Sequence, residues 1–152
     1  MPEVSVIIPI YNESKNIPIL FEKLSSVLKP MDYEIVAVND GSKDDSWAEL
    51  VKIASSVKNV RIINFVKNYG QTAALTAGIN NATGEIIILI DSDLENDPED
   101  IPKLLDKIRE GFDVVSGWRQ KRWKGQWLRR KLPSMMANKL ISRISGVHLH
   151  DY

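Results

Sequence analysis

Short apolar runs alternate along the chain with segments of helical periodicity. The runs are rich in Val and Ile and are bounded by polar or Gly-containing turns, which predicts strands over residues 4–10, 34–40, 60–66, 85–91 and 112–117. Between them, Leu, Ile and Ala recur three and four residues apart, which predicts helices over residues 15–28, 44–57, 72–82 and 100–110. Strands and helices that alternate in this way imply an α/β fold, a Rossmann-like and mostly parallel sheet with helices on both faces. The strand over 85–91 is the most apolar, and we expect it to be central.

The alternation ends after Gly117. Residues 118–131 combine tryptophans with many Lys and Arg residues, and Pro133 predicts the first turn of one more helix, over residues 133–146. The chain then reaches its last residue without a signal that ends a helix or a strand. We therefore expect residues 1–152 to form a single domain that is truncated at its C-terminal end.

Composition narrows the function classes. The chain is 43% hydrophobic and 26% charged, which is a globular balance, and it has no cysteine. Disulfides, thiolate metal sites and a cysteine nucleophile are therefore excluded. No apolar run approaches the roughly 18 residues that a bilayer-spanning helix needs. The N-terminus has no basic region ahead of its apolar stretch, so we expect a cytoplasmic protein.

The formal net charge of zero hides an uneven distribution. Half of the 20 acidic residues lie between residues 84 and 113, whereas residues 114–150 contain Lys and Arg and no acid. Such a division is typical of two different ligands, or of two ends of one ligand. The alternative is a pair of solvated surfaces.

Polar residues follow four of the predicted strands, at residues 11–13, 39–42, 67–71 and 91–93. In an open parallel sheet the carboxyl ends of the strands lie along one edge, where ligands bind. The sequence therefore predicts that these segments converge on one site.

Asp91 and Asp93 form a D-x-D motif directly after the fourth apolar run. Carboxylates this close repel each other unless a cation lies between them, and Mg²⁺ or Mn²⁺ commonly bridges such oxygens to substrate phosphates. The alternative is that both acids only cap the next helix. Glu95 is a possible further ligand, whereas the acids of residues 97–100 are expected to stabilise the start of that helix.

Asp40, followed by Gly41 and Ser42, fits a turn that holds a nucleoside, because a carboxylate accepts hydrogen bonds from a base N–H or a ribose hydroxyl. The alternative is a simple helix entry. Asn12 and Ser14 are the candidate caps of the first helix. Neither G-x-G-x-x-G nor G-x-x-x-x-G-K-[ST] occurs, which argues against dinucleotide dehydrogenases and P-loop NTPases.

Taken together, the stretches VSVIIPIYNESKNI, EIVAVNDGSKDDS and NYGQTAALTAGINNATGEIIILIDSDLENDPEDI resemble the family 2 glycosyltransferases with the GT-A fold. SGWRQKRW, LRRKLPSMMANKLISRISG and the final HDY resemble the polyprenyl-phosphate branch, which includes dolichol-phosphate mannose synthase. The resemblance covers nearly the whole chain. It implies a GT-A catalytic domain that moves a sugar from a nucleotide-diphosphate sugar to undecaprenyl or dolichyl phosphate. The implied reaction is a metal-assisted displacement that inverts the configuration at the anomeric carbon.

The resemblance also assigns roles to residues. Asp93 and Asp151 match catalytic positions, Asp151 as a group that orients the acceptor or the sugar. Asp91, Asp93 and Glu95 would hold Mg²⁺ or Mn²⁺, although many relatives carry glutamine at the position of Glu95. The nucleotide-sugar site would contain Pro9, Tyr11, Glu13, Asp40, Gly70, Gln71 and Asp91.

Arg119, Arg130 and Ser134 match the acceptor-phosphate site of this branch, and guanidinium groups suit phosphate well. The tryptophans and cations of residues 118–131 suit an anionic membrane surface, so we expect action at the cytoplasmic face of a membrane. Packing between helices is the alternative for the tryptophans. The acidic segment beside them argues against nucleic-acid binding.

Two other functions fit parts of the pattern. An aspartate-dependent Mg²⁺ phosphatase or phosphotransferase also has a D-x-D motif after a strand, but its nucleophilic aspartate usually follows the first strand, which here ends in Pro-Ile-Tyr-Asn-Glu. A catalytically idle module that only binds a nucleotide sugar is the non-enzymatic alternative.

Overall fold

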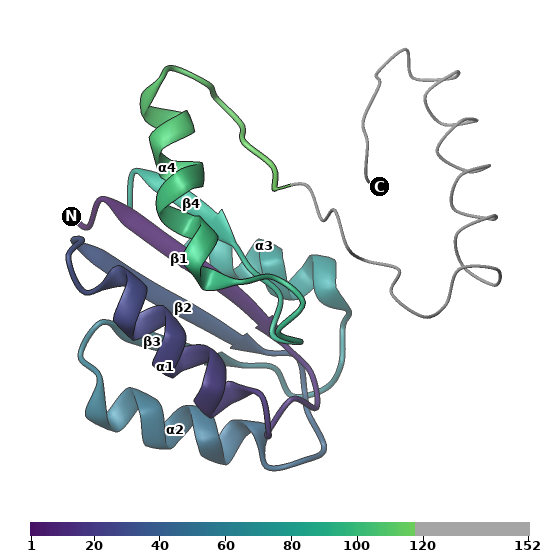
Figure 1. Cartoon of the computed structure of the whole chain (residues 1–152). Coiled ribbons are helices and arrows are strands. Elements are labelled where there is room, and N and C mark those ends of the chain that lie inside the picture. Colours follow the sequence, from purple (N-terminus) through teal and green to yellow (C-terminus); the bar gives the residue numbers. More distant parts are fainter. Residues whose placement is uncertain (118–152) are drawn as a thin grey trace, which may run out of the picture. The chain divides into compact units, whose positions relative to one another are not determined.

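The computed structural model describes residues 1–117 (Figure 1). The described residues divide into two units, with the boundary after residue 103. The first unit contains β1 (Val4–Ile10), α1 (Ile17–Leu28), β2 (Tyr33–Asn39), α2 (Ser46–Ser56), β3 (Val60–Asn64), α3 (Gln71–Asn81), β4 (Ile86–Leu89) and the short 3₁₀ helix η1 (Pro98–Asp100). Helix α4 (Ile101–Arg109) crosses from the first unit into the second.

The four strands form one parallel sheet in the order β3-β2-β1-β4. Val4 of β1 pairs with Tyr33 of β2 on one side and with Ile86 of β4 on the other. The predicted parallel sheet is therefore confirmed. Because β1 lies between β2 and β4, the loops that follow these three strands emerge next to one another.

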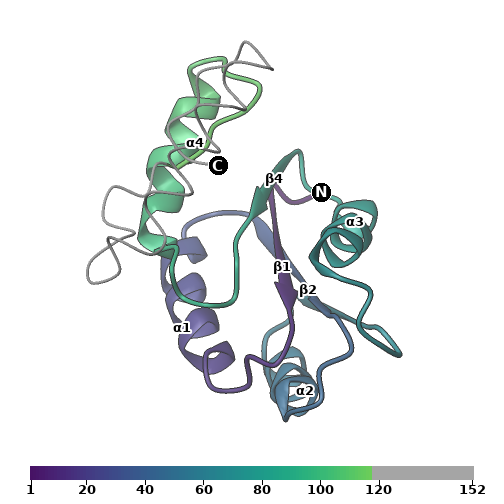
Figure 2. The same ribbon diagram turned by 90° about the vertical axis from the view of Figure 1, so that its right-hand side faces the viewer.

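Helices cover both faces of this sheet, as predicted. Figure 2 shows α3 on one face, with α1 and α2 on the other. On the α3 face a core cluster joins Ile7, Val36, Val38 and Ala74. The helix approaches β1 closely because position 78 is glycine: a Cβ there would lie 2.3 Å from Cγ2 of Ile7.

On the other face α1 buries one stripe of side chains. Leu20, Leu24 and Leu28 recur every four residues and are fully buried. Val6 and Ile8 of β1 alternate with Ile7 and therefore point to this side of the sheet, where they too are fully buried. Apolar side chains thus enclose the central strands from both faces.

The expectation of a central fourth strand is wrong for the described part of the chain. There, β4 lies at the edge of the sheet, and Ile87 and Leu89 are 42% and 52% exposed. The central strands are β1 and β2. Apolar composition indicates that side chains are suited to burial, but it does not determine how many neighbours the backbone has.

The strand predicted over 112–117 is wrong as well, because no strand occurs there among the described residues. Phe112 and Val114 are 56% and 83% exposed. A strand exists only through a ladder of backbone hydrogen bonds, and a short local alternation does not supply that partner. The helix predicted over 133–146 lies outside the described residues, and the organisation of residues 1–152 as a single domain stays a prediction.

A buried carboxylate connects three strands at their amino ends. Glu34 Oε1 accepts hydrogen bonds from Ser5 Oγ (2.6 Å) and from Thr83 N and Oγ1, and Glu34 Oε2 pairs with the Arg61 guanidinium. Burial alone would raise the pKa of Glu34, but the bonds from Ser5, Thr83 and Arg61 outweigh it and lower the pKa to about 2. At neutral pH Glu34 is therefore a satisfied, ionised group inside the fold.

Candidate active site

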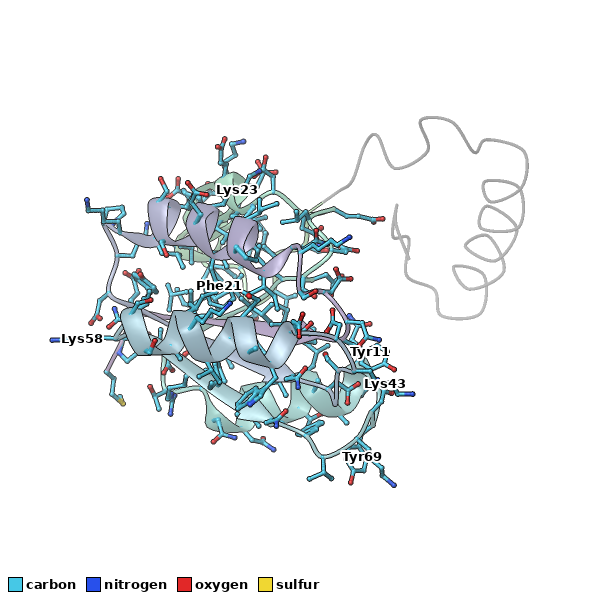
Figure 3. All side chains as sticks on the ribbon, turned by 90° about the horizontal axis from the view of Figure 1, so that it is seen from below. Tyr11, Phe21, Lys23, Lys43, Lys58 and Tyr69 are labelled. Carbon is cyan, nitrogen blue, oxygen red and sulfur yellow. The ribbon has the colours of Figure 1, made fainter. Side chains whose placement is uncertain are left out.

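A pocket of about 300 Å³ opens at the carboxyl ends of β1, β2 and β4. Figure 3 shows Tyr11, Lys43 and Tyr69 at this end of the unit and Lys58 at the opposite end. The pocket is lined by Pro9, Ile10, Tyr11, Glu13, Asp40, Asn68, Gly70, Gln71, Asp91, Ser92 and Asp93. The structure thus brings together every residue expected at the nucleotide-sugar site, along with Asp93. Ile10 was missed from the sequence, whereas Asn68 and Ser92 belong to segments that were expected to converge here but had no role assigned.

Asp40 is 3% exposed and fixes one wall of the pocket. Its Oδ1 accepts a hydrogen bond from the backbone N–H of Tyr69 (2.7 Å), and its Oδ2 accepts one from that of Gly70 (2.9 Å). Gly70 precedes α3 with a φ of +94°, which glycine adopts without strain. Since each carboxylate oxygen has two lone pairs, Asp40 keeps acceptor capacity for a ligand.

Gly41 allows the loops after β2 and β3 to touch. Its φ is +64°, and a Cβ there would lie 2.3 Å from the carbonyl carbon of Lys67. Any side chain at position 41 would therefore push the backbone of residues 67–70 away from Asp40. Position 41 therefore requires glycine for two reasons: the close contact between the two loops and the positive φ of the turn.

Gln71, the first residue of α3, reaches across the pocket to the turn that follows β4. Its Nε2 donates a hydrogen bond to Oδ1 of Asp91 (2.8 Å). The resemblance implied that Gln71 belongs to the nucleotide-sugar site, without defining a contact for it. The structure gives it one, and this bond fixes one of the two aspartates of the D-x-D motif.

Ser92 anchors the turn that carries the two aspartates. It is 6% exposed, and its Oγ donates to the carbonyl oxygen of Pro9 at the end of β1 (3.1 Å). Asp93 Oδ1 accepts a bond from the backbone N–H of Glu95 (2.9 Å). Leu94 has a φ of +64°, a strained value for a bulky residue, and such strain is concentrated at functional sites.

The donor set suits a divalent cation that also binds substrate phosphates. Within residues 1–117 no group of three or more His, Asp or Glu side chains is arranged to hold a metal by itself. Asp91 and Asp93 both line the pocket, and Mg²⁺ typically takes only one or two protein carboxylates beside phosphate and water oxygens. Glu95 is not among the lining residues, and its role as a ligand stays a prediction.

The interpretation of the acids at 97–100 is confirmed at Asp97, which caps η1 by accepting a hydrogen bond from the N–H of Glu99. By contrast, the expected caps of α1 are wrong. The N-cap residue is Asn16, without a side-chain cap bond, whereas Asn12 and Ser14 bond to the loop after β2.

Four further residues of the predicted site lie outside the described part of the chain: Arg119, Arg130, Ser134 and Asp151.

Two solved structures show the similarity in fold. Glucosyl-3-phosphoglycerate synthase from Mycobacterium tuberculosis, with Mn²⁺, UDP and glucosyl-3-phosphoglycerate bound, matches with a TM-score of 0.73 at 20% identity, over 95% of this chain and 51% of that one. S. aureus TarS in complex with UDP-GlcNAc matches with a TM-score of 0.59 at 26% identity, over 71% and 31%. The predicted GT-A type of α/β fold is confirmed.

A curated relative extends the similarity to sequence. The dodecaprenyl-phosphate galacturonate synthase of Rhizobium johnstonii is 41% identical over 154 aligned residues, which cover 99% of this chain and 45% of that protein. The chain thus spans slightly less than half the length of this relative. The model of glycosyl transferase family 2 matches residues 5–152. On these grounds the chain belongs to glycosyl transferase family 2.

Proposed function

We propose that this protein transfers a sugar from a nucleotide-diphosphate sugar to a polyprenyl phosphate. The observation that carries the proposal is the pocket in which Asp91 and Asp93 meet the Asp40-anchored loop of residues 68–71. A relative that is 41% identical is a dodecaprenyl-phosphate galacturonate synthase, which supports a lipid phosphate as the acceptor.

The donor would occupy the pocket with its diphosphate near Asp91 and Asp93 and its nucleoside near Tyr11 and Asp40. The mannosyltransferase PcManGT from Pyrobaculum calidifontis is 29% identical over 60% of this chain, with a TM-score of 0.50, and was solved with GDP-Man and Mn²⁺. This supports a divalent cation, and we propose Mg²⁺ or Mn²⁺ with Asp91 and Asp93 as its protein ligands. Such a cation would neutralise the charge that develops on the leaving diphosphate.

In the proposed reaction an oxygen of the lipid phosphate forms a bond to the anomeric carbon as the bond to the nucleoside diphosphate breaks, with inversion at that carbon. A phosphate monoester is already anionic near neutral pH, so no strong base is needed. The main task of the protein is alignment, which Asp40, Gln71 and Ser92 serve by fixing the pocket walls. Arg119, Arg130 and Ser134 are proposed to bind the acceptor phosphate, and Asp151 to orient the acceptor or the sugar.

A lipid acceptor requires access to a membrane. No helix within residues 1–117 is long and apolar enough to cross one. We propose that the protein works at the cytoplasmic face of a membrane, where the tryptophans and cations of residues 118–131 would contact the lipid surface.

The phosphatase alternative is less well supported. Its nucleophilic aspartate would usually follow β1, but here the D-x-D motif follows β4, and β1 is followed by Tyr11. Membership of glycosyl transferase family 2 also favours the transferase.

An assay of purified protein with Mn²⁺, a panel of nucleotide sugars and a short polyprenyl phosphate tests the proposal. Nucleoside diphosphate that appears only when the lipid phosphate is present, together with a glycosylated lipid, is the expected result. Inorganic phosphate released from a phosphomonoester would instead establish the phosphatase. Nucleotide-sugar binding without turnover, even in the full-length protein, would establish the idle binding module.

A further inference from the structure

The loop between β1 and α1 is held by side chains of the loop between β2 and α2. Three successive backbone N–H groups, at Asn12, Glu13 and Ser14, donate to Ser42 Oγ (2.9 Å), Ser46 Oγ (2.9 Å) and Asp44 Oδ2 (3.0 Å). These N–H groups lie beyond the strand and before the helix, so neither element supplies their acceptors. The backbone of the first loop therefore takes its position from the side chains of the second.

Asp44 is the centre of this arrangement. Its Oδ2 accepts from Ser14 N, and its Oδ1 accepts from both the N–H (3.0 Å) and the hydroxyl of Ser46. Because the Ser46 hydroxyl donates to Asp44, its lone pairs are left to accept from Glu13 N. Ser46 is fully buried, which excludes water as a substitute partner.

Asp44 also keeps its charge over a wide pH range. Burial would raise the pKa of Asp44, but the hydrogen bonds from Ser46 and Ser14 outweigh it and lower the pKa to about 2. A carboxylate accepts bonds through both oxygens at once, whereas an amide in its place offers only one acceptor oxygen. The three bonds to Asp44 therefore require the carboxylate.

Glu13 and Tyr11 belong to the loop that these hydrogen bonds hold, and both line the pocket, whereas Asp44 does not. We propose that Asp44 is a positioning residue for donor binding, acting through Ser46 and the backbone of residues 13–14 to hold the pocket wall that carries Glu13 and Tyr11. This inference rests on the proposed function, since it presumes that the pocket takes a nucleoside diphosphate. The competing role is structural: Asp44 accepts the N–H at the start of α2 and could serve stability alone.

The Asp44→Asn variant of the whole chain separates these roles. Whichever way the amide is turned, either Ser14 N or Ser46 loses its acceptor. We expect the Kd for UDP or GDP with Mn²⁺ and the KM for the nucleotide sugar to rise about tenfold, while kcat at saturating donor stays within about twofold. Ser46→Ala, which removes the acceptor of Glu13 N but keeps the carboxylate, should shift Kd in the same direction and decides the matter if Asp44→Asn does not fold.

Glu34→Gln is the control for general damage to the fold. Glu34 accepts several hydrogen bonds in the same way but lies at the amino ends of the strands, away from the pocket. This variant should lower the Tm and leave the Kd unchanged. An unchanged Kd in Asp44→Asn and Ser46→Ala, with a lower Tm, would overturn the positioning role and leave the proposed function intact. A wild-type protein that binds no nucleoside diphosphate of any common base with Mn²⁺ would overturn both.

Discussion

Replacing Glu34 by glutamine should remove a large part of the stability of the fold at neutral pH. In the native protein Glu34 Oε1 accepts from Ser5 and Thr83, while Oε2 pairs with Arg61. Glutamine has nearly the same size and keeps one acceptor oxygen. Its amide group then either faces the Arg61 guanidinium, donor against donor, or turns toward Ser5 and Thr83 and leaves them without an acceptor.

The pKa of Glu34 gives the magnitude. Lowering the pKa from 4.5 to about 2 corresponds to about 3 kcal/mol of stability at neutral pH, because each unit by which a pKa is lowered contributes about 1.36 kcal/mol. The Arg61 side chain is 47% exposed, so solvent weakens its share of the interaction. We therefore expect Glu34→Gln to lower the free energy of unfolding by about 2–3 kcal/mol at pH 7.

The sign of the pH dependence follows from the same shift. As the pH falls, the unfolded chain takes up a proton on Glu34 near pH 4.5, before the folded protein does near pH 2. The stabilisation by Glu34 is therefore complete above about pH 5 and is lost as the pH falls toward 2. The difference between wild type and Glu34→Gln should shrink across this window, while other carboxylates affect both proteins alike.

Urea unfolding followed by circular dichroism at pH 7 and pH 3.5 measures these differences. Glu49→Gln is the matched control, because it makes the same chemical change in a surface pair with Lys52, where solvent weakens the interaction, and should cost much less. Two results would show that the charge of Glu34 does not stabilise the strands. The first is a free energy of unfolding for Glu34→Gln within about 0.5 kcal/mol of wild type at pH 7. The second is a difference in free energy of unfolding between the two proteins that is the same at pH 7 and pH 3.5.

Three further predictions concern the pocket and the acceptor. Asp93→Ala should abolish Mn²⁺-dependent nucleotide binding in calorimetry without lowering the Tm, and unchanged affinity would contradict the proposed metal site. Gln71→Ala, which frees Asp91, should weaken nucleotide binding by about 3- to 10-fold in a thermal-shift titration, and an unaltered titration would show that the bond to Asp91 is incidental. Arg130→Ala should raise the KM for the lipid phosphate and leave nucleotide affinity alone, so equal loss of both would refute separate donor and acceptor sites.

Much of the pocket was predictable because parallel strands bring their carboxyl ends to one edge of the sheet. Asp40 and Asp91 are far apart in sequence, yet each follows a strand, and the alternating pattern alone implies that both lie at the same edge of the sheet. That their strands both flank β1 is known only from the structure. The D-x-D spacing and the glycines at 41 and 70 could likewise be found without a structure, because each has a local chemical meaning.

The contacts that hold the loops could not be predicted in the same way. Asn12 and Ser14 fit the composition of helix caps, and only the folded chain reveals that the loop after β2 bonds to them instead. Ser92 stands between two aspartates without any pattern that marks it as an anchor, because its partner, the Pro9 carbonyl, is a backbone group distant in sequence. Side-chain bonds between loops depend on the fold, and local sequence carries no signal for them.

These bonds between loops bear on how the pocket would work. If the reaction needs alignment and charge neutralisation more than a strong base, the kcat/KM for the donor depends on how rigidly the pocket walls are held before the donor arrives. Segments that follow all four strands line the pocket, and the side chains of Asp44, Asp40 and Gln71 tie these segments to one another. A substitution in any of these ties changes the pocket without touching the reacting atoms, so donor affinity should respond to it more than kcat does. If these ties mattered only after the donor had bound, each variant would instead lose kcat with little change in donor affinity, and that result would refute the argument.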